Sequence, residues 1–179
     1  MPRLTRAIKE ARRLLADQPL KSAMVPVQKI ARQFAHVLGQ TLPDEISGVL
    51  VPLASPLRGK VWTIVYNSHH SRVRQRFTIA HELGHLLLHS FTVPHADHGF
   101  KLRFRNAESS EGSVLEEIEA NQFAAELLMP RELVVAEAGR LGLDYADPDG
   151  EDLAVLAETF KVSKLAISIR VGNLAGVVA

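Results

Sequence analysis

Two histidines four residues apart, with a glutamate directly after the first, restrict how the middle of this chain can fold. The segment is His81-Glu82-Leu83-Gly84-His85. On an α-helix, side chains four residues apart lie on one face, about one turn from each other, so both imidazoles can bind one metal ion. The intervening glutamate can then act as general base toward a metal-activated water. A five-residue pattern is weak by itself, so its weight depends on the residues around it.

The surrounding residues predict a buried helix. The run from Phe77 to His89 has a helical composition, Thr78 can serve as the N-cap, and apolar residues recur at helical spacing. A helix that is apolar nearly all round belongs in a protein core. Buried imidazoles and carboxylates are costly unless they are paired or bound to a metal. A metal ion therefore explains their presence directly.

A catalytic zinc site needs a third protein ligand and one open position. The segment from Val114 to Pro130 predicts a second helix with three candidates, Glu116, Glu117 and Glu119. We favour Glu117, because its stripe is small and apolar apart from one asparagine and so suits close approach to another helix. Glu116 is the second choice. Glu119 shares a stripe with Gln122 and Glu126, which is typical of a solvated face.

Three further residues are candidates for supporting roles. Asn121, one turn after Glu117, can hydrogen-bond a ligand or a ligand histidine. His89 lies one turn after His85 and could support the site or stabilise the transition state, whereas a fourth protein ligand would close the open position. His70 could polarise a substrate carbonyl, or it could be an ordinary loop histidine.

The segments from Phe77 to His89 and from Glu117 to Pro130, in this order and at this separation, resemble the ImmA/IrrE family of bacterial and phage metallopeptidases. The resemblance extends upstream through Val61 to Asn67 and downstream through Leu153 to Ala175. It implies a zincin-like site with His81, His85 and Glu117 on one zinc ion and Glu82 as the catalytic base.

The resemblance also implies a protein substrate. Members of this family would cleave a helix-turn-helix repressor and so release stress-response, phage or mobile-element genes. The residues of this chain do not themselves show that substrate, and they predict no oligomeric state. The donor set does not select one metal either, because His/His/Glu sites accept several divalent ions.

The expected fold class is α+β, with a zincin-like minimal core in which a small three-stranded sheet packs on the HExxH helix and the glutamate-bearing helix. We expect one domain over residues 1–179, divided into N-terminal helices (1–45), a catalytic core (46–130) and a C-terminal helical part (131–179). The predicted strands are 46–53 and 61–67, joined as a hairpin, and 100–105. The predicted helices outside the core are 4–15, 27–38, 133–141, 153–160 and 164–174.

The remaining segments are expected to be loops. They are 90–99, 106–113, the acidic connector 144–152 and a basic stretch that holds Arg72, Arg74 and Arg76. In zincin-like folds, which this chain resembles, an edge strand pairs with the extended substrate backbone. Either 61–67 or 100–105 could supply that edge.

Composition limits the cellular context and the choice of metal ligands. The chain has no cysteine, so any metal must be held by histidine and carboxylate groups. It shows no stretch long enough to span a membrane and no signal-peptide pattern, so a cytoplasmic location is expected. The formal net charge of +1 provides no general basic field for nucleic acid.

The C-terminal helix pair supports a competing hypothesis. Residues 153–160 and 164–174 have the spacing of a helix-turn-helix, whose second helix would enter the major groove. The first turns of that helix hold only two cations, Lys164 and Arg170, and no Asn or Gln to recognise bases. Nucleic acid is therefore not the expected partner. The alternatives to a peptidase are a DNA-binding regulator with a vestigial zinc site, and a toxin-like component held by a repressor-like partner.

Overall fold

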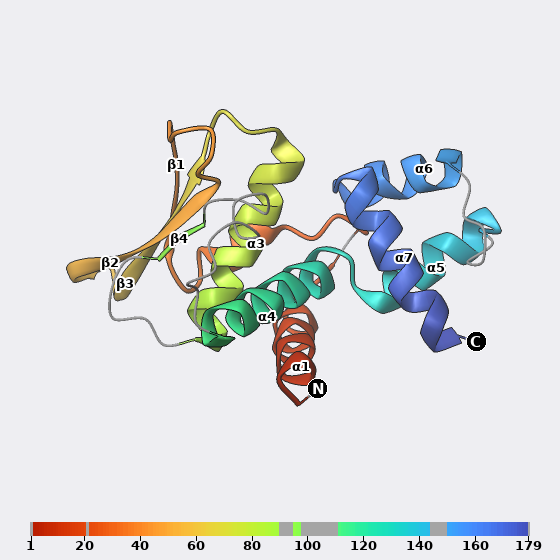
Figure 1. Cartoon of the computed structure of the whole chain (residues 1–179), viewed down its shortest axis with the longest axis horizontal. Helices are drawn as coiled ribbons and strands as arrows, with labels where there is room; N and C mark the ends of the chain where they lie inside the picture. The colour runs from red at the N-terminus through yellow and green to blue at the C-terminus, as the bar shows by residue number, and fades with distance from the viewer. Residues whose placement is uncertain (1, 21, 90–94, 98–110, 144–149, 179) are drawn as a thin grey trace.

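Helix α3 (Arg72–Leu88) lies at the centre of the molecule, between a small sheet and a group of helices. The computed structural model describes residues 2–20, 22–89, 95–97, 111–143 and 150–178. Figure 1 shows the sheet on one side of α3, with α4 (Glu111–Leu128) and α1 (Pro2–Ala16) crossing below it. Helices α5 (Arg131–Leu141), α6 (Gly150–Phe160) and α7 (Lys164–Val178) gather beyond the far end of α4.

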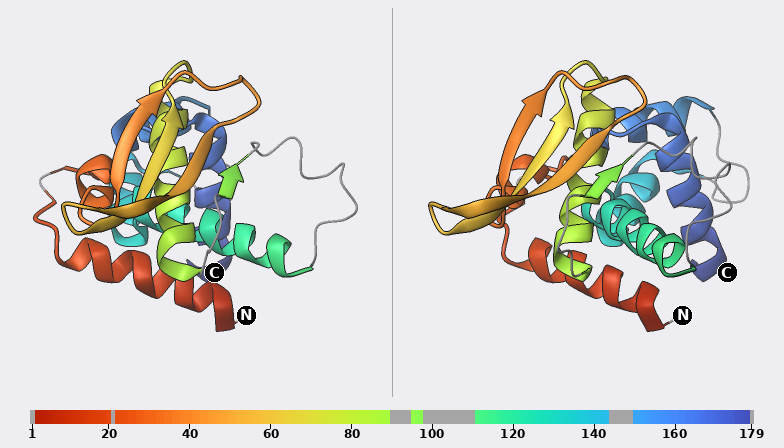
Figure 2. Two further views of the ribbon diagram at one scale, coloured as in Figure 1. Left: turned by 90° about the vertical axis from the view of Figure 1, so that its left-hand side faces the viewer. Right: turned by 60° about the vertical axis from the view of Figure 1, so that its left-hand side comes forward.

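The sheet contains β1 (His36–Gln40), β2 (Gly48–Leu57), β3 (Lys60–Asn67) and the short β4 (His95–Asp97), in the order β1-β3-β2-β4. The predicted hairpin is confirmed, because β2 and β3 pair antiparallel. Its turn is made by Arg58 and Gly59, whose φ angles of 50° and 77° match the twist that tight hairpins require. Figure 2 shows the four strands side by side.

The predicted helix over 27–38 is wrong in its second half. Helix α2 (Val27–Ala31) ends early, and β1 then pairs parallel to β3, with Val37 opposite Ile64. Pairing with a distant strand has overridden the local helical pattern. The region 1–45 is therefore not purely helical, and His36 begins a strand.

Two other expectations about strands change. The strand predicted over 61–67 is present as β3, but its expected place at the edge of the sheet is wrong, because β3 is paired on both sides. The stretch 90–99, expected to be a loop, contains β4, which pairs with β2 from Gly48 to Leu50. The predicted strand 100–105 lies outside the described residues.

The central helix begins earlier than predicted. Its N-cap is Ser71, whose side chain accepts a hydrogen bond from the Arg74 amide at 3.4 Å, and not Thr78, which lies inside the helix. The basic stretch expected to be a loop therefore forms the first turns of α3. Side chains four residues apart in that stretch, such as Arg72 and Arg76, consequently share one face.

The C-terminal helices follow the predicted pattern. Gly142 ends α5 in the left-handed conformation (φ 71°), and the turn between α6 and α7 is Lys161-Val162-Ser163. Ser163 caps α7 by accepting from the Ala166 amide at 3.1 Å. The connector 144–152 is shorter than expected, since α6 already begins at Gly150.

The α+β fold class with a zincin-like core is confirmed, although the sheet has four described strands instead of the expected three. It packs on α3, and α3 packs on α4. Among the described helices, none combines the length and apolar character needed to cross a membrane.

Candidate metal centre

Close packing of α3 on α4 brings the candidate ligands together. A Cβ atom at Gly84 would lie 3.0 Å from Cδ1 of Phe123 and 3.2 Å from Cα of Ala120. Only a glycine at this position, facing a small residue on α4, permits so short a distance between the two helices. Glu117 lies about one turn before Ala120 and is thereby placed beside the two histidines of α3.

Three donor groups converge between the helices. His81, His85 and Glu117 each offer one ligand atom, and these atoms all lie within 4.8 Å of one another. The Nε2 atoms of the two histidines are 3.0 Å apart. The Glu117 carboxylate oxygens lie 2.9 Å from His85 Nε2 and 3.3 Å from His81 Nε2. Of the three glutamates considered, Glu117 is the one that the structure places in this cluster.

The hydrogen bond made by Nδ1 of His81 determines the tautomer of the ring, and with it whether Nε2, which faces the cluster, has a free lone pair. Nδ1 of His81 lies 3.0 Å from the Asn121 side-chain oxygen. That oxygen can only accept, so Nδ1 carries the proton and Nε2 has a lone pair. Asn121 thus contacts His81, and its role in supporting a ligand histidine stays a prediction.

Hydrogen bonds through His89 and Glu119 determine the tautomer of His85 in the same way. Nδ1 of His85 lies 3.1 Å from Nδ1 of His89, and Nε2 of His89 lies 3.0 Å from a carboxylate oxygen of Glu119. An ionised carboxylate accepts, so His89 donates from Nε2 and, as a neutral ring, accepts at Nδ1. His85 must then donate from Nδ1, which leaves the lone pair on its Nε2.

The expectation that Glu119 faces solvent is therefore wrong. Its side chain is 5% exposed and paired with His89, whose side chain is equally buried. The prediction from helical spacing failed because α4 packs against both α3 and α1, so more than one of its faces is buried. The sequence did contain one signal, because His89 continues the His81–His85 stripe and needs a partner of its own.

This donor set fits a divalent metal ion. Two imidazole lone pairs and a carboxylate point at one buried location, and without a cation they would repel one another. Neutral imidazole and carboxylate are the ligand types that zinc accepts, and three of them leave a position open. The ligand roles of His81, His85 and Glu117 remain predictions that this geometry supports.

Glu82 lies on the sheet side of α3 and is completely buried. A Cβ atom at Gly48, the first residue of β2, would lie 3.2 Å from Oε1 of Glu82 and would overlap the Thr78 methyl group. Gly48 therefore leaves the space in which the Glu82 carboxylate lies. This role of Gly48 could not be predicted from the sequence, because residues 48 and 82 meet only after β2 has packed on α3.

His70 is placed away from the cluster. It precedes α3, about three helical turns before His81, and its Nε2 lies 3.1 Å from the backbone oxygen of Asp44. It is not among the described residues that could hold a metal together. His70 is therefore not placed among the candidate metal ligands, and its role toward a substrate carbonyl stays a prediction.

A second buried pair concerns the competing DNA-binding hypothesis. Arg170 of α7 forms a buried ion pair with Glu126 of α4, and its Nε donates to the Met129 carbonyl at 3.0 Å. Arg12 of α1 donates to the same carboxylate at 2.8 Å. Glu126, expected on a solvated face, is thus 1% exposed and joins three helices. One of the two cations considered for DNA contact is therefore occupied inside the protein.

Comparison with protein families gives a match over most of the chain. The model of the Peptidase M78 family, the IrrE N-terminal-like domain, matches residues 43–171. This span includes α3 and α4 and with them every residue of the cluster. No curated protein matches the chain.

Proposed function

Because the chain belongs to the Peptidase M78 family of IrrE N-terminal-like metallopeptidases, we propose that it is a zinc-dependent endopeptidase. The observation that carries the proposal is the buried convergence of His81, His85 and Glu117 within 4.8 Å. His81 and His85 would bind through Nε2 and Glu117 through its carboxylate, and another divalent ion could replace zinc. A bound ion supplies a Lewis acid that polarises a peptide carbonyl and makes water nucleophilic near neutral pH.

Glu82 is the proposed general base. It follows a ligand histidine directly, so its carboxylate is held beside the metal position but on the sheet side of α3. There it accepts a proton from the attacking water and passes it to the amine that leaves. Burial excludes bulk water from Glu82, and the rigid helix limits its movement, so little reorganisation is needed during the reaction.

The strand β4 is the proposed docking edge for the substrate. Among the described strands, β4 lies at the end of the sheet and pairs only with β2. Its Asp97 pairs with Gly48, the residue that faces Glu82. An extended peptide added to this edge would run past the metal position, and main-chain pairing would bind it with little dependence on its side chains.

The proposed substrate is a helix-turn-helix repressor whose cleavage releases stress-response, phage or mobile-element genes. This step rests on the family resemblance, not on a contact in the structure. Cleavage of a DNA-bound regulator would place the protein in the cytoplasm, where such regulators act.

The test is co-expression with repressors encoded beside the gene, comparing the parent chain with Glu82→Gln and measuring bound metal in both. We expect cleavage by the parent chain alone and equal metal contents. A repressor that is bound but not cut by the metal-loaded parent would favour the toxin-like alternative.

The DNA-binding alternative is tested by charge reversal. A deletion of residues 153–179 is unsuitable as a test, because it would remove core side chains such as Phe160 and Ile167 and unfold the protein. A substitution of the exposed Lys164 leaves the core intact. Loss of DNA retention in Lys164→Glu with unchanged peptide cleavage would favour a DNA-binding role.

A further inference from the structure

A basic pocket lies on the face of α3 that points away from the candidate metal centre. Its cavity, about 390 Å³, lies between α2, α3 and β3 and is open to solvent. Ile79 lines this pocket, whereas His81 belongs to the metal cluster. The two residues are two positions apart, which corresponds to a rotation of about 200° around the helix axis. The two sites therefore share a helix but use different faces of it.

Four cations line the pocket: Lys29, Arg32, Arg72 and Arg76. None of the ten lining residues is acidic, although the whole chain holds 20 Asp and Glu residues against 21 Lys and Arg residues. The pocket's charge is thus a local concentration in a nearly neutral protein. No ion pair joins any of these four side chains to a carboxylate in the described part of the chain.

Arg76 shows most clearly that the positive charge is uncompensated. Its guanidinium is half-buried and donates to the backbone oxygens of Val25, at 3.0 Å, and Lys161, at 3.2 Å. Burial lowers the pKa of Arg76, with no carboxylate opposing that effect. The two carbonyls fix its position but do not neutralise its charge, and an arginine stays protonated in proteins. A bound anion would offset this cost of burial.

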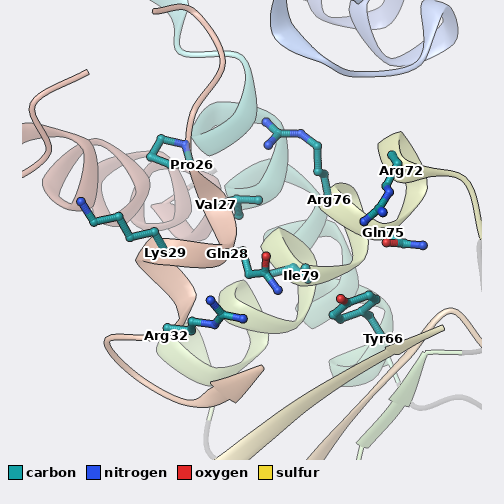
Figure 3. A pocket seen from close by; sticks show the side chains of 10 residues that line it. All are labelled: Pro26, Val27, Gln28, Lys29, Arg32, Tyr66, Arg72, Gln75, Arg76 and Ile79. Carbon is teal, nitrogen blue, oxygen red and sulfur yellow. The ribbon is translucent and has the colours of Figure 1, made fainter. Parts of the chain in front are cut away.

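Helical spacing in the first turns of α3 determines which arginines line the pocket. Arg72 and Arg76 are four residues apart and line it together. Arg74 points elsewhere and donates to the Ser47 hydroxyl at 2.7 Å. In Figure 3 the Arg32 guanidinium and the Gln28 amide face the space between α2 and α3, whereas the Lys29 ammonium points away from it. Lys29 therefore belongs to the rim.

The wall of the pocket is apolar and aromatic. Val27 and Ile79 form part of it, and the Tyr66 hydroxyl is turned toward the cavity (Figure 3). A Cβ atom at Gly39 would lie 2.9 Å from the Tyr66 hydroxyl oxygen, so the glycine leaves room for the tyrosine there. A volume of a few hundred Å³ with an apolar wall and a few convergent polar groups is typical of small-molecule sites.

We propose that this pocket binds a small phosphate-bearing molecule. Guanidinium groups match phosphate oxygens with paired hydrogen bonds. A phosphate group offers more oxygens and more negative charge than a carboxylate, so it suits a pocket lined by several arginines better. The apolar wall beside them would contact the organic part of the ligand, and Gln28 and Tyr66 would bind its polar groups.

Calorimetric titration of the metal-loaded full chain with inorganic phosphate and with AMP tests the proposal. Arg32 and Arg72 are exposed, so the Arg32→Glu/Arg72→Glu variant should fold, and circular dichroism would verify this. We expect this variant to bind either probe at least about tenfold more weakly. The control is Lys9→Glu/Lys164→Glu, which makes the same change in charge at exposed positions on α1 and α7 and should stay within about twofold of the parent.

The two probes distinguish the sources of the phosphate. Equal affinities would indicate that the site recognises free phosphate, and tighter binding of AMP would indicate an organic phosphate. Binding must persist after a chelator removes the metal, since loss of binding would assign the anion to the metal centre and overturn the proposal. Equal affinity in the pocket variant and the control would overturn it as well. Binding of duplex DNA but of neither probe would show a nucleic-acid surface instead. None of these outcomes depends on peptidase activity.

Discussion

Glu119 and His89 lie 3.0 Å apart, carboxylate oxygen to Nε2, in a pair that is nearly inaccessible to solvent. Through this contact Glu119 selects the tautomer of His89, and His89 selects that of His85. Glu119 is not a proposed ligand, yet it thus determines whether Nε2 of His85, a proposed ligand atom, can bind a metal ion.

We predict that Glu119→Gln weakens metal binding about tenfold to a hundredfold. The amide would no longer hold a proton on His89 Nε2 as strongly, so His85 would lose its preferred tautomer. Competition with a chromogenic chelator would measure the affinity. The control is Glu116→Gln, the same substitution on the same helix at a half-buried position outside the cluster. Equal affinities of the two variants would contradict the prediction.

Glu117→Gln should reduce metal affinity by more than Glu119→Gln does, because it weakens a direct ligand rather than a supporting group. The same chelator competition would rank Glu116, Glu117 and Glu119 in one experiment. A larger loss for Glu116→Gln than for Glu117→Gln would mean that the third ligand has been assigned wrongly.

Glu82→Gln should keep its metal and lose cleavage. The amide nearly preserves the shape of the side chain but cannot accept the proton, and general-base catalysis typically contributes about 10²–10⁴-fold. The measurement is the rate of cleavage of a peptide or repressor substrate at equal metal content. Cleavage at the parent rate would exclude Glu82 as the base.

Gly48→Ala should slow cleavage about tenfold or more without removing the metal, because the new methyl group would overlap the Thr78 methyl and press on the Glu82 carboxylate. The variant Gly48→Ala/Thr78→Ser removes the Thr78 methyl and should recover much of the rate. Steady-state kinetics with metal analysis would separate this effect from unfolding. A single variant as active as the parent would show that the space beside Glu82 is not needed.

Arg170→Met should destabilise the fold by about 3–5 kcal/mol, because it leaves the Glu126 carboxylate buried with only the half-exposed Arg12 as partner. Replacing both charges, as in Arg170→Met/Glu126→Leu, should restore much of the stability. The control Arg140→Met breaks an exposed pair with Glu137 and should cost less than about 1 kcal/mol. Urea denaturation would compare these variants, and similar losses for Arg170→Met and Arg140→Met would show that the buried pair contributes little.

Spacing along the chain was enough to predict the features that depend on neighbours within a helical turn or two. The pairing of His81 with His85, the proposed base Glu82 and the proposed support from Asn121 all follow from the HExxH pattern and helical spacing. The same reasoning chose Glu117 from the stripe that it shares with small residues, and it placed the C-terminal helix pair correctly.

Which distant groups meet could not be predicted from spacing and depends on the packing of the folded chain. Glu119 and Glu126 looked solvated, yet they pair with His89 and Arg170, which lie 30 and 44 residues away. Gly48 borders Glu82, β1 replaces part of a predicted helix, and Arg72 joins Arg32 across a pocket. Periodicity shows which side chains share a face, but it does not show what packs against that face. That depends on how the whole chain buries its apolar surface and satisfies its buried polar groups.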